Sequence, residues 1–152
     1  MCFHISTNAS TQSRNNNTAN EFVDYYHVSG FDHPKIGLLY NRNIISSYWG
    51  LIPHWVKNQQ QALLIRGKTL NARIETLKSK PSFKKVSFNR GILFVDGFFE
   101  FKHQKNKKIP HYIYNDNPIG IGTILSEWIN PVTGEIISSF SIVTHKASNV
   151  LK

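Results

Sequence analysis

Short apolar or alternating runs, separated by polar turns, dominate the chain and predict a domain rich in β-strands. The strand candidates are residues 1–6, 36–40, 44–52, 92–95, 98–103, 110–114, 119–128 and 135–144. Asp96-Gly97 and the segment from Asn130 to Gly134 are turn signals, and each is expected to separate two neighbouring strands.

Helical patterns are fewer and shorter. Residues 19–28 combine apolar and aromatic side chains with two acids near their start, and 71–80 are closed off by Pro81, so both segments favour a short helix. Residues 7–20 are mainly Asn, Ser, Thr and Gln and predict a polar loop. An apolar run occupies 62–65. Together, these predicted strands and helices indicate a strand-rich α+β fold in a single domain, residues 1–152, with a few short helices.

Composition narrows the class of protein. A chain of 152 residues with 40% hydrophobic and 18% charged residues suits one folded domain and excludes a disordered chain. The longest apolar runs have four residues, whereas a membrane-spanning helix needs roughly 20, so no membrane partner is expected. No signal peptide is recognised at the N-terminus. The single cysteine excludes an intrachain disulfide and a Cys-based zinc cluster, and the expected location is the cytoplasm.

Positive charge is concentrated in the middle of the chain. Residues 33–108 hold fifteen Lys and Arg against three acids, a net charge of +12. The whole chain has a net charge of +9, because the segments before and after are slightly acidic. This distribution suits a polyanion such as nucleic acid. The alternative is a basic, solvated surface without a partner.

Common catalytic signatures are absent from the sequence. It contains no G-x-S-x-G elbow, no phosphate-cradling glycine loop and no H-E-x-x-H motif. The seven histidines are scattered, and no pair has the spacing of a metal site. Neither a metal nor another cofactor is therefore expected.

Cys2 is the most informative single residue. Removal of Met1 would leave an amine and a thiol on adjacent carbons, with ordinary pKa values of about 8 and 8.5. An aldehyde can condense with such an amine to an imine, and the thiol then closes a thiazolidine ring in an intramolecular step. An N-terminal cysteine can also act as a hydrolytic nucleophile with its own amine as base. The plainer alternative is a small apolar residue on an N-terminal strand.

Four blocks follow Cys2 in a fixed order: WGLIPHW at 49–55, NARIET at 71–76, VDGFFEF at 95–101 and THKASN at 144–149. This ordered set resembles the SOS-response-associated peptidase family, the abasic-site-processing proteins, and the resemblance spans nearly the whole chain. It implies a barrel-like arrangement of coiled β-sheets. It also implies binding of single-stranded DNA and capture of the ring-opened aldehyde of an abasic site on Cys2, after autocatalytic removal of Met1.

The resemblance further implies roles for three residues. Asn71 would hold the sugar or the ring near Cys2, Arg73 would contact phosphate, and Glu100 would shuttle protons beside the Cys2 amine. Dehydration of a carbinolamine needs an acid, which fits a carboxyl group at this position. Asn71 is alternatively a helix N-cap, and Arg73 a solvated or structurally paired residue.

Two aromatic contexts add to this interpretation. Glu100 lies among phenylalanines, where a carboxyl group is expected to be desolvated and suited to an acid role; the alternative is an exposed position on a strand edge. Stacking of bases on aromatic rings is tolerant of sequence. A platform for single-stranded DNA is therefore predicted from Trp49, Trp55, Lys57, Arg66 and Lys68. One of the two tryptophans is expected to be buried in the core instead.

The chain departs from the family pattern at several positions. Phe3-His4 follows Cys2 where Gly-Arg is usual, and Phe101 replaces a tryptophan. Family members continue into a block with a His assigned to proton transfer and crosslink reversal, whereas this chain stops at Lys152. A crosslink that forms and reverses slowly is therefore expected.

Three functional hypotheses remain at this stage. The first is a monomeric, nucleoid-associated protein that captures abasic sites in single-stranded DNA. The second is a single-strand-binding module whose catalysis is lost. The third is an unrelated N-terminal-nucleophile hydrolase, for which no other feature of the sequence argues.

Overall fold

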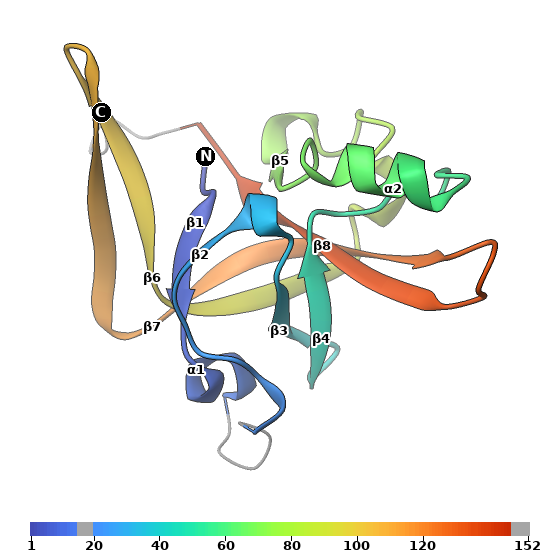
Figure 1. The fold of residues 1–152 in the computed structure, drawn as a ribbon, viewed down its shortest axis with the longest axis horizontal. Helices are drawn as coiled ribbons and strands as arrows, with labels where there is room; N and C mark the ends of the chain where they lie inside the picture. The colour runs from blue at the N-terminus through green and yellow to red at the C-terminus, as the bar shows by residue number, and fades with distance from the viewer. Residues whose placement is uncertain (15–19, 147–152) are drawn as a thin grey trace.

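The computed structural model describes residues 1–14 and 20–146 (Figure 1). In chain order its strands, α-helices and 3-10 helices (η) are β1 (His4–Thr7), α1 (Ala9–Ser13), β2 (Tyr25–Ser29), η2 (Gly30–Asp32), β3 (Lys35–Tyr40), β4 (Asn43–Trp49), α2 (Gln59–Arg66), β5 (Asn71–Arg73), η3 (Ile74–Thr76), η4 (Lys84–Val86), β6 (Arg90–Gln104), β7 (Lys107–Ile129) and β8 (Ile136–Thr144).

The strands close into a barrel. Hydrogen-bonded pairing runs from β6 to β3, β4, β8 and β7 and returns from β7 to β6, so that within the described residues five strands form a ring. The β4–β8 pair is parallel and the other pairs of the ring are antiparallel. Strands β1 and β2 extend the sheet beyond β6, and β5 lies parallel to β8. The predicted strand-rich, barrel-like α+β fold is confirmed.

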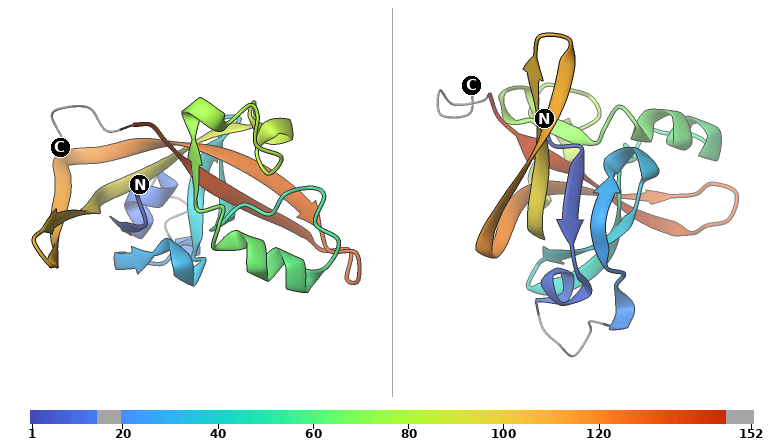
Figure 2. Two further views of the ribbon diagram at one scale, coloured as in Figure 1. Left: turned by 90° about the horizontal axis from the view of Figure 1, so that it is seen from above. Right: turned by 60° about the vertical axis from the view of Figure 1, so that its left-hand side comes forward.

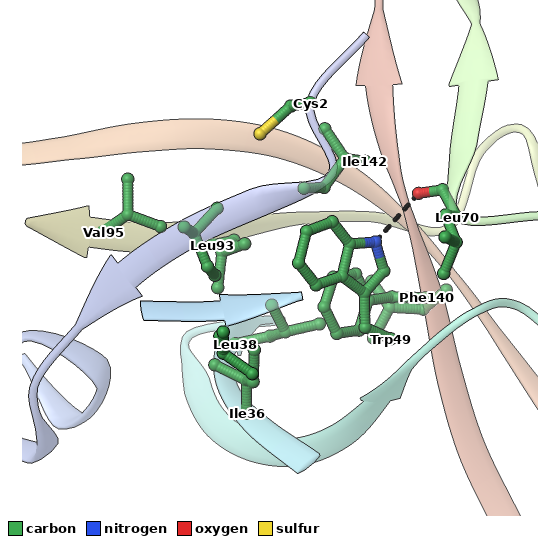
Figure 3. Close-up of a cluster of buried hydrophobic side chains, with 12 residues drawn as sticks. Cys2, Ile36, Leu38, Trp49, Leu70, Leu93, Val95, Phe140 and Ile142 are labelled. Carbon is green, nitrogen blue, oxygen red and sulfur yellow. Dashed lines mark hydrogen bonds between the residues drawn. The ribbon is translucent and has the colours of Figure 1, made fainter. Parts of the chain in front are cut away.

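Trp49 lies at the centre of the largest buried cluster (Figure 3). Its ring stacks on Phe140 at a centroid distance of 6.2 Å, and its indole N–H donates to the Leu70 carbonyl at 2.9 Å. Gly30 is required beside it, because a Cβ at that position would lie 2.9 Å from the indole ring. Burial of this cluster supplies most of the apolar driving force for closing the barrel.

Both segments predicted to be helices are strands in part. Within 19–28, residues from Tyr25 onward form β2, because Val28 packs into the core opposite Ile5 of β1. Asn71 opens β5 rather than a helix, since parallel pairing with β8 takes up its backbone, and only the single turn η3 follows. The α-helices lie elsewhere: α1 within the predicted polar loop and α2 around the apolar run at 62–65.

Asp96-Gly97 is a bulge within the continuous strand β6, and not the predicted turn. The Asp96 carboxylate accepts hydrogen bonds from the Asn8 backbone N–H at 2.8 Å and the Thr11 hydroxyl at 2.5 Å, so it fixes the start of α1. A Cβ on Gly97 would lie 2.5 Å from the Tyr112 ring, which explains the glycine.

Strands β6 and β7 continue past this bulge and project from the barrel as a two-stranded arm (Figure 1; Figure 2 shows it from two further directions). The predicted strands at 92–95 and 98–103 are thus one strand, as are those at 110–114 and 119–128. Because β1 pairs with β6 from His4↔Phe99 to Ser6↔Gly97, the N-terminus lies against the base of the arm.

Candidate active site

Cys2 lies just before β1 and is buried, with 7% of its surface exposed. It belongs to the same apolar cluster as Leu93, Val95 and Ile142 (Figure 3). Its thiol is directed to the His4 carbonyl, with Sγ 3.9 Å from that oxygen. Burial, followed by the negative charge of Glu100, raises the pKa of the Cys2 thiol to about 12. With Met1 in place the sulfur is therefore a neutral thiol at physiological pH.

Glu100 lies beside the N-terminus. Its Oε1 is 3.8 Å from the Met1 amino nitrogen, and the β1–β6 pairing holds the two together. The side chain is 41% exposed, so the expected desolvation by the neighbouring phenylalanines is only partial. The alternative, an exposed position on a strand edge, holds in part, because at Glu100 β6 pairs with β7 whereas its pairing with β1 ends at Phe99.

Asn71 has a side chain without hydrogen bonds. Both its Oδ1 and its Nδ2 are buried and lack a partner in the part of the chain that the structure describes. Its backbone register partner in β8 is Ile142, a member of the cluster that contains Cys2. A helix N-cap role is excluded, because Asn71 is in a strand. An unsatisfied buried amide costs about 1–3 kcal/mol, which makes this side chain a candidate for binding a ligand.

Arg73 is exposed two residues further along β5, on the same side of the strand as Asn71. Its neighbour Glu75 accepts a hydrogen bond from the Lys146 backbone N–H at 3.0 Å. Backbone hydrogen bonds, with a smaller contribution from the positive charge of Arg73, lower the pKa of the Glu75 carboxyl. Arg73 is thus exposed and interacts electrostatically with Glu75.

Of the two tryptophans, one is a core residue and the other a surface residue, which agrees with the expectation that one of them is buried. Trp49 has no exposed surface, so its assignment to the DNA platform is wrong: both ring faces are covered by the core. Trp55 is 44% exposed. It borders an open groove of about 490 Å³ that is lined by both polar and apolar side chains, some of them from α2. The lining residues are Trp55, Lys57, Gln61, Leu64, Ile65 and Lys68.

Arg66 does not line this groove. Its guanidinium lies 5.1 Å above the Tyr48 ring, and its Nε donates to the Gly50 carbonyl at 3.4 Å. One terminal nitrogen, Nη2, is buried without a partner among the described residues. The structure thus brings Trp55, Lys57 and Lys68 together and directs the Arg66 head elsewhere.

Comparison with known proteins identifies the family. The family model described as SOS response associated peptidase (SRAP) matches residues 1–152. The chain belongs to the SRAP family. The SRAP barrel of this chain superimposes on a crystal structure of a protein from Bacteroides thetaiotaomicron with a TM-score of 0.88 and 32% identity, covering 99% of this chain and 71% of that one.

Two SRAP relatives have names that refer to abasic sites. Abasic site processing protein YoqW of Bacillus subtilis is 30% identical over 146 residues, which cover 86% of this chain and 63% of YoqW. Abasic site processing protein HMCES of Xenopus tropicalis is 26% identical over 131 residues, 72% of this chain and 39% of HMCES. The chain thus spans less than two thirds of the length of these relatives.

Thr144 is a further candidate site residue, which the sequence interpretation did not name. Its hydroxyl oxygen is buried without a partner in the described ranges, and its backbone is in register with Arg73, next to Asn71. Its position at the start of the THKASN block was the available signal. Asn149, in the same block of this SRAP chain, lies outside the described residues.

No helix in residues 1–14 and 20–146 is long and apolar enough to cross a membrane. Within the same residues no group of three or more His, Cys, Asp or Glu side chains is arranged to hold a metal ion. The candidate site of this SRAP domain comprises the Cys2 thiol, the Glu100 carboxylate and the Asn71 amide.

Proposed function

We propose that this protein captures abasic sites in single-stranded DNA by forming a thiazolidine on Cys2 once Met1 has been removed. The names of its relatives support abasic-site processing. The observation that carries the proposal is the position of the N-terminus, which lies between the thiol of Cys2 and the Glu100 carboxylate. The Met1 amino nitrogen is 3.8 Å from Glu100 Oε1.

The chemistry balances with water alone. Hydrolysis of the Met1–Cys2 peptide bond releases methionine and leaves a free amine on Cys2. The amine adds to the lesion aldehyde to give a carbinolamine, which loses water to form an imine. The sulfur then adds to the imine carbon, its proton passes to the nitrogen, and the thiazolidine closes with a net loss of one water.

Glu100 is the proton carrier in this series of reaction steps. Its carboxyl group would protonate the departing hydroxyl of the carbinolamine and afterwards accept a proton from the closing ring. The sulfur attacks the imine carbon, which exists only once the amine has reacted with the aldehyde, so the amine reacts first and the sulfur second. Formation of the imine precedes formation of the C–S bond for that reason.

Asn71 and Arg73 position the substrate. The unpartnered amide of Asn71 would donate to and accept from the deoxyribose hydroxyl groups, and so satisfy both of its buried atoms. The exposed guanidinium of Arg73 would bind a backbone phosphate. A base beside the lesion would stack on Trp55, between Lys57 and Lys68, in the groove along α2. The protein would act as a monomer at single-stranded regions of the nucleoid.

Mass spectrometry tests this proposal. Intact protein that has lost Met1, mixed with a single-stranded oligonucleotide containing one abasic site, is expected to gain the oligonucleotide mass less one water. The same protein that retains Met1 serves as the control and forms no such adduct. A protein that loses Met1 and binds the oligonucleotide without any adduct would instead be a noncovalent single-strand-binding module.

A further inference from the structure

An exposed ladder of aromatic and imidazole rings crosses the sheet at the base of the arm. It spans four adjacent strands, β2, β1, β6 and β7, with successive ring centroids 4.8–5.4 Å apart. We name this surface the aromatic ladder, and its members, in the order in which their rings contact one another, are Phe101, His4, His27, Phe99, Tyr112 and Tyr114.

The aromatic ladder lies on the opposite face of the sheet from the candidate active site. Side chains alternate along β6, so that Phe99 and Phe101 project on one face and Glu100, which contacts the Met1 amine, on the other. The register places Tyr112 across from Phe99, on the ladder face. The ladder is therefore separate from the surface that would hold the lesion.

Rings at the outer end of the ladder are held in place and yet open to solvent. Phe101, Tyr112 and Tyr114 are 41%, 43% and 67% exposed. The Tyr112 hydroxyl is 2.6 Å from the Ser6 hydroxyl, and its ring fills the space left by Gly97, so its plane is fixed. Rings of fixed orientation lose little entropy when a flat ligand stacks on them.

His4 contributes to the ladder as a ring and not as a fixed charge. His4 Nδ1 lies 3.1 Å from His27 Nε2, and the two rings are stacked with an interplanar angle of 11°. Burial, followed by the neighbouring His27, lowers the pKa of His4, which keeps that ring uncharged at neutral pH. The ladder is thus an extended platform of π faces.

Positive charge surrounds the outer end of the platform. Residues 101–112 of the arm contain four lysines and no acid. Alternation places Lys108 on the ladder face, opposite His103 and next to Pro110. A second copy of this chain would bring two such lysine clusters together at a net charge of +9 each, which argues against self-association.

We propose that the aromatic ladder is a second binding site for single-stranded nucleic acid, which stacks two or three bases on its rings while the arm lysines contact the flanking phosphates. Sheets that present exposed aromatic rings bind single strands in this way, and stacking tolerates any base. The site needs no lesion and does not depend on Cys2. It would hold an undamaged part of the strand on the reverse face of the sheet.

Binding of undamaged oligothymidylates of increasing length, followed by fluorescence anisotropy, tests the site. The double variant Phe101→Ala/Tyr114→Ala is expected to bind a long oligothymidylate at least about tenfold more weakly than wild type, because two stacking surfaces are removed. Tyr26→Ala, which removes a ring that is 89% exposed on β2 and outside the ladder, is the matched control and is expected to bind like wild type. Equal affinities for the double variant and the control would overturn the proposal.

Covalent capture distinguishes this inference from the proposed function. With a short oligonucleotide that carries an abasic site, the double variant is expected to form the Cys2 adduct at the wild-type rate. Absence of the adduct in wild type would refute the proposed function and leave the ladder measurement valid. A wild type that sediments as a dimer, with a monomeric double variant, would assign the ladder to a second copy and overturn the proposal.

A measurement on the unaltered protein covers the case in which the double variant does not fold. Ultraviolet crosslinking to an oligonucleotide with 5-bromodeoxyuridine in place of thymidine is expected to label peptides that contain Phe101 or Tyr114. Labelling confined to the segments around Trp55 and Arg73 would show that the ladder face is empty.

Discussion

The Met1 amino nitrogen and the Glu100 carboxylate oxygen lie 3.8 Å apart across the β1–β6 strand pair. This contact orients the first residue of the chain and places a negative charge beside the thiol of the second. Before Met1 is removed, the Glu100 carboxylate thus helps to keep the Cys2 thiol protonated. After Met1 is removed, the same carboxylate would transfer protons at the Cys2 amine.

Cys2→Ala is expected to abolish the covalent adduct with abasic single-stranded DNA and to leave noncovalent binding within about twofold of wild type. Only Cys2 can supply an amine and a thiol on adjacent carbons, whereas the DNA contacts come from other residues. Denaturing electrophoresis after heating measures the adduct. A heat-stable adduct of the thiazolidine type in the variant would contradict the assignment.

Glu100→Gln is expected to change two rates in opposite directions. Removal of the negative charge lowers the Cys2 pKa toward its ordinary value, though burial still keeps it elevated, so that iodoacetamide alkylates the thiol faster at a fixed pH. Loss of the proton carrier slows adduct formation by about 10²–10⁴-fold.

Glu135→Gln, an exposed acid in the β7–β8 connection, is the matched control for Glu100→Gln and is expected to alter neither rate. Alkylation is measured on protein whose intact mass shows that Met1 is retained. Unchanged alkylation in Glu100→Gln would rule out electrostatic coupling between the carboxylate and the thiol.

Asn71→Ala is expected to lose activity without losing stability. Both amide atoms are buried without partners within the described residues, so their removal relieves a desolvation cost that offsets the lost packing. We expect the free energy of unfolding to fall by no more than about 1 kcal/mol while the capture rate falls at least about tenfold. Urea denaturation and single-turnover capture measure the two effects. A destabilised variant that captures at the wild-type rate would assign Asn71 to structure alone.

Trp49 and Trp55 are expected to respond differently to alanine substitution. Trp49→Ala removes a fully buried ring and should lower the free energy of unfolding by about 3–5 kcal/mol. Trp55→Ala removes a ring that is 44% exposed, so it should leave stability nearly unchanged and weaken binding to single-stranded DNA about tenfold. Thermal unfolding and anisotropy give both values. A Trp55 variant with wild-type affinity would exclude the groove along α2 as a DNA contact.

Lys57 and Lys68 are expected to bind DNA through charge. Each phosphate contact contributes about −0.7 to the slope of log affinity against log salt concentration for a single strand, so the double variant Lys57→Gln/Lys68→Gln should flatten that slope by about 1.4. Arg42→Gln, in the β3–β4 turn, is the control for loss of a positive charge outside the groove. A slope equal to that of the control would show that the groove lysines do not contact phosphate.

The sequence determined by itself what depends on local pattern and on ordered motifs. Alternation of apolar residues located most strands, and the blocks that follow Cys2 pointed to the family; the assignment of Glu100 and Asn71 to the site stays a prediction. The concentration of lysine and arginine between 33 and 108 predicts a polyanionic partner. Each of these properties is carried by neighbouring residues or by chain order.

Tertiary structure decided whatever depends on partners distant in sequence. Asn71 is in a strand because β8 pairs with it, although its own segment has a helical pattern. Asp96-Gly97 continues β6 because the Asp96 carboxylate binds Asn8 and Thr11 at the start of α1. Trp49 and Trp55 lie six residues apart in one motif, and only closure of the barrel around Phe140 made the first a core residue and left the second at the surface. Burial is a property of the assembled chain, because the atoms that exclude water from a ring come from other strands.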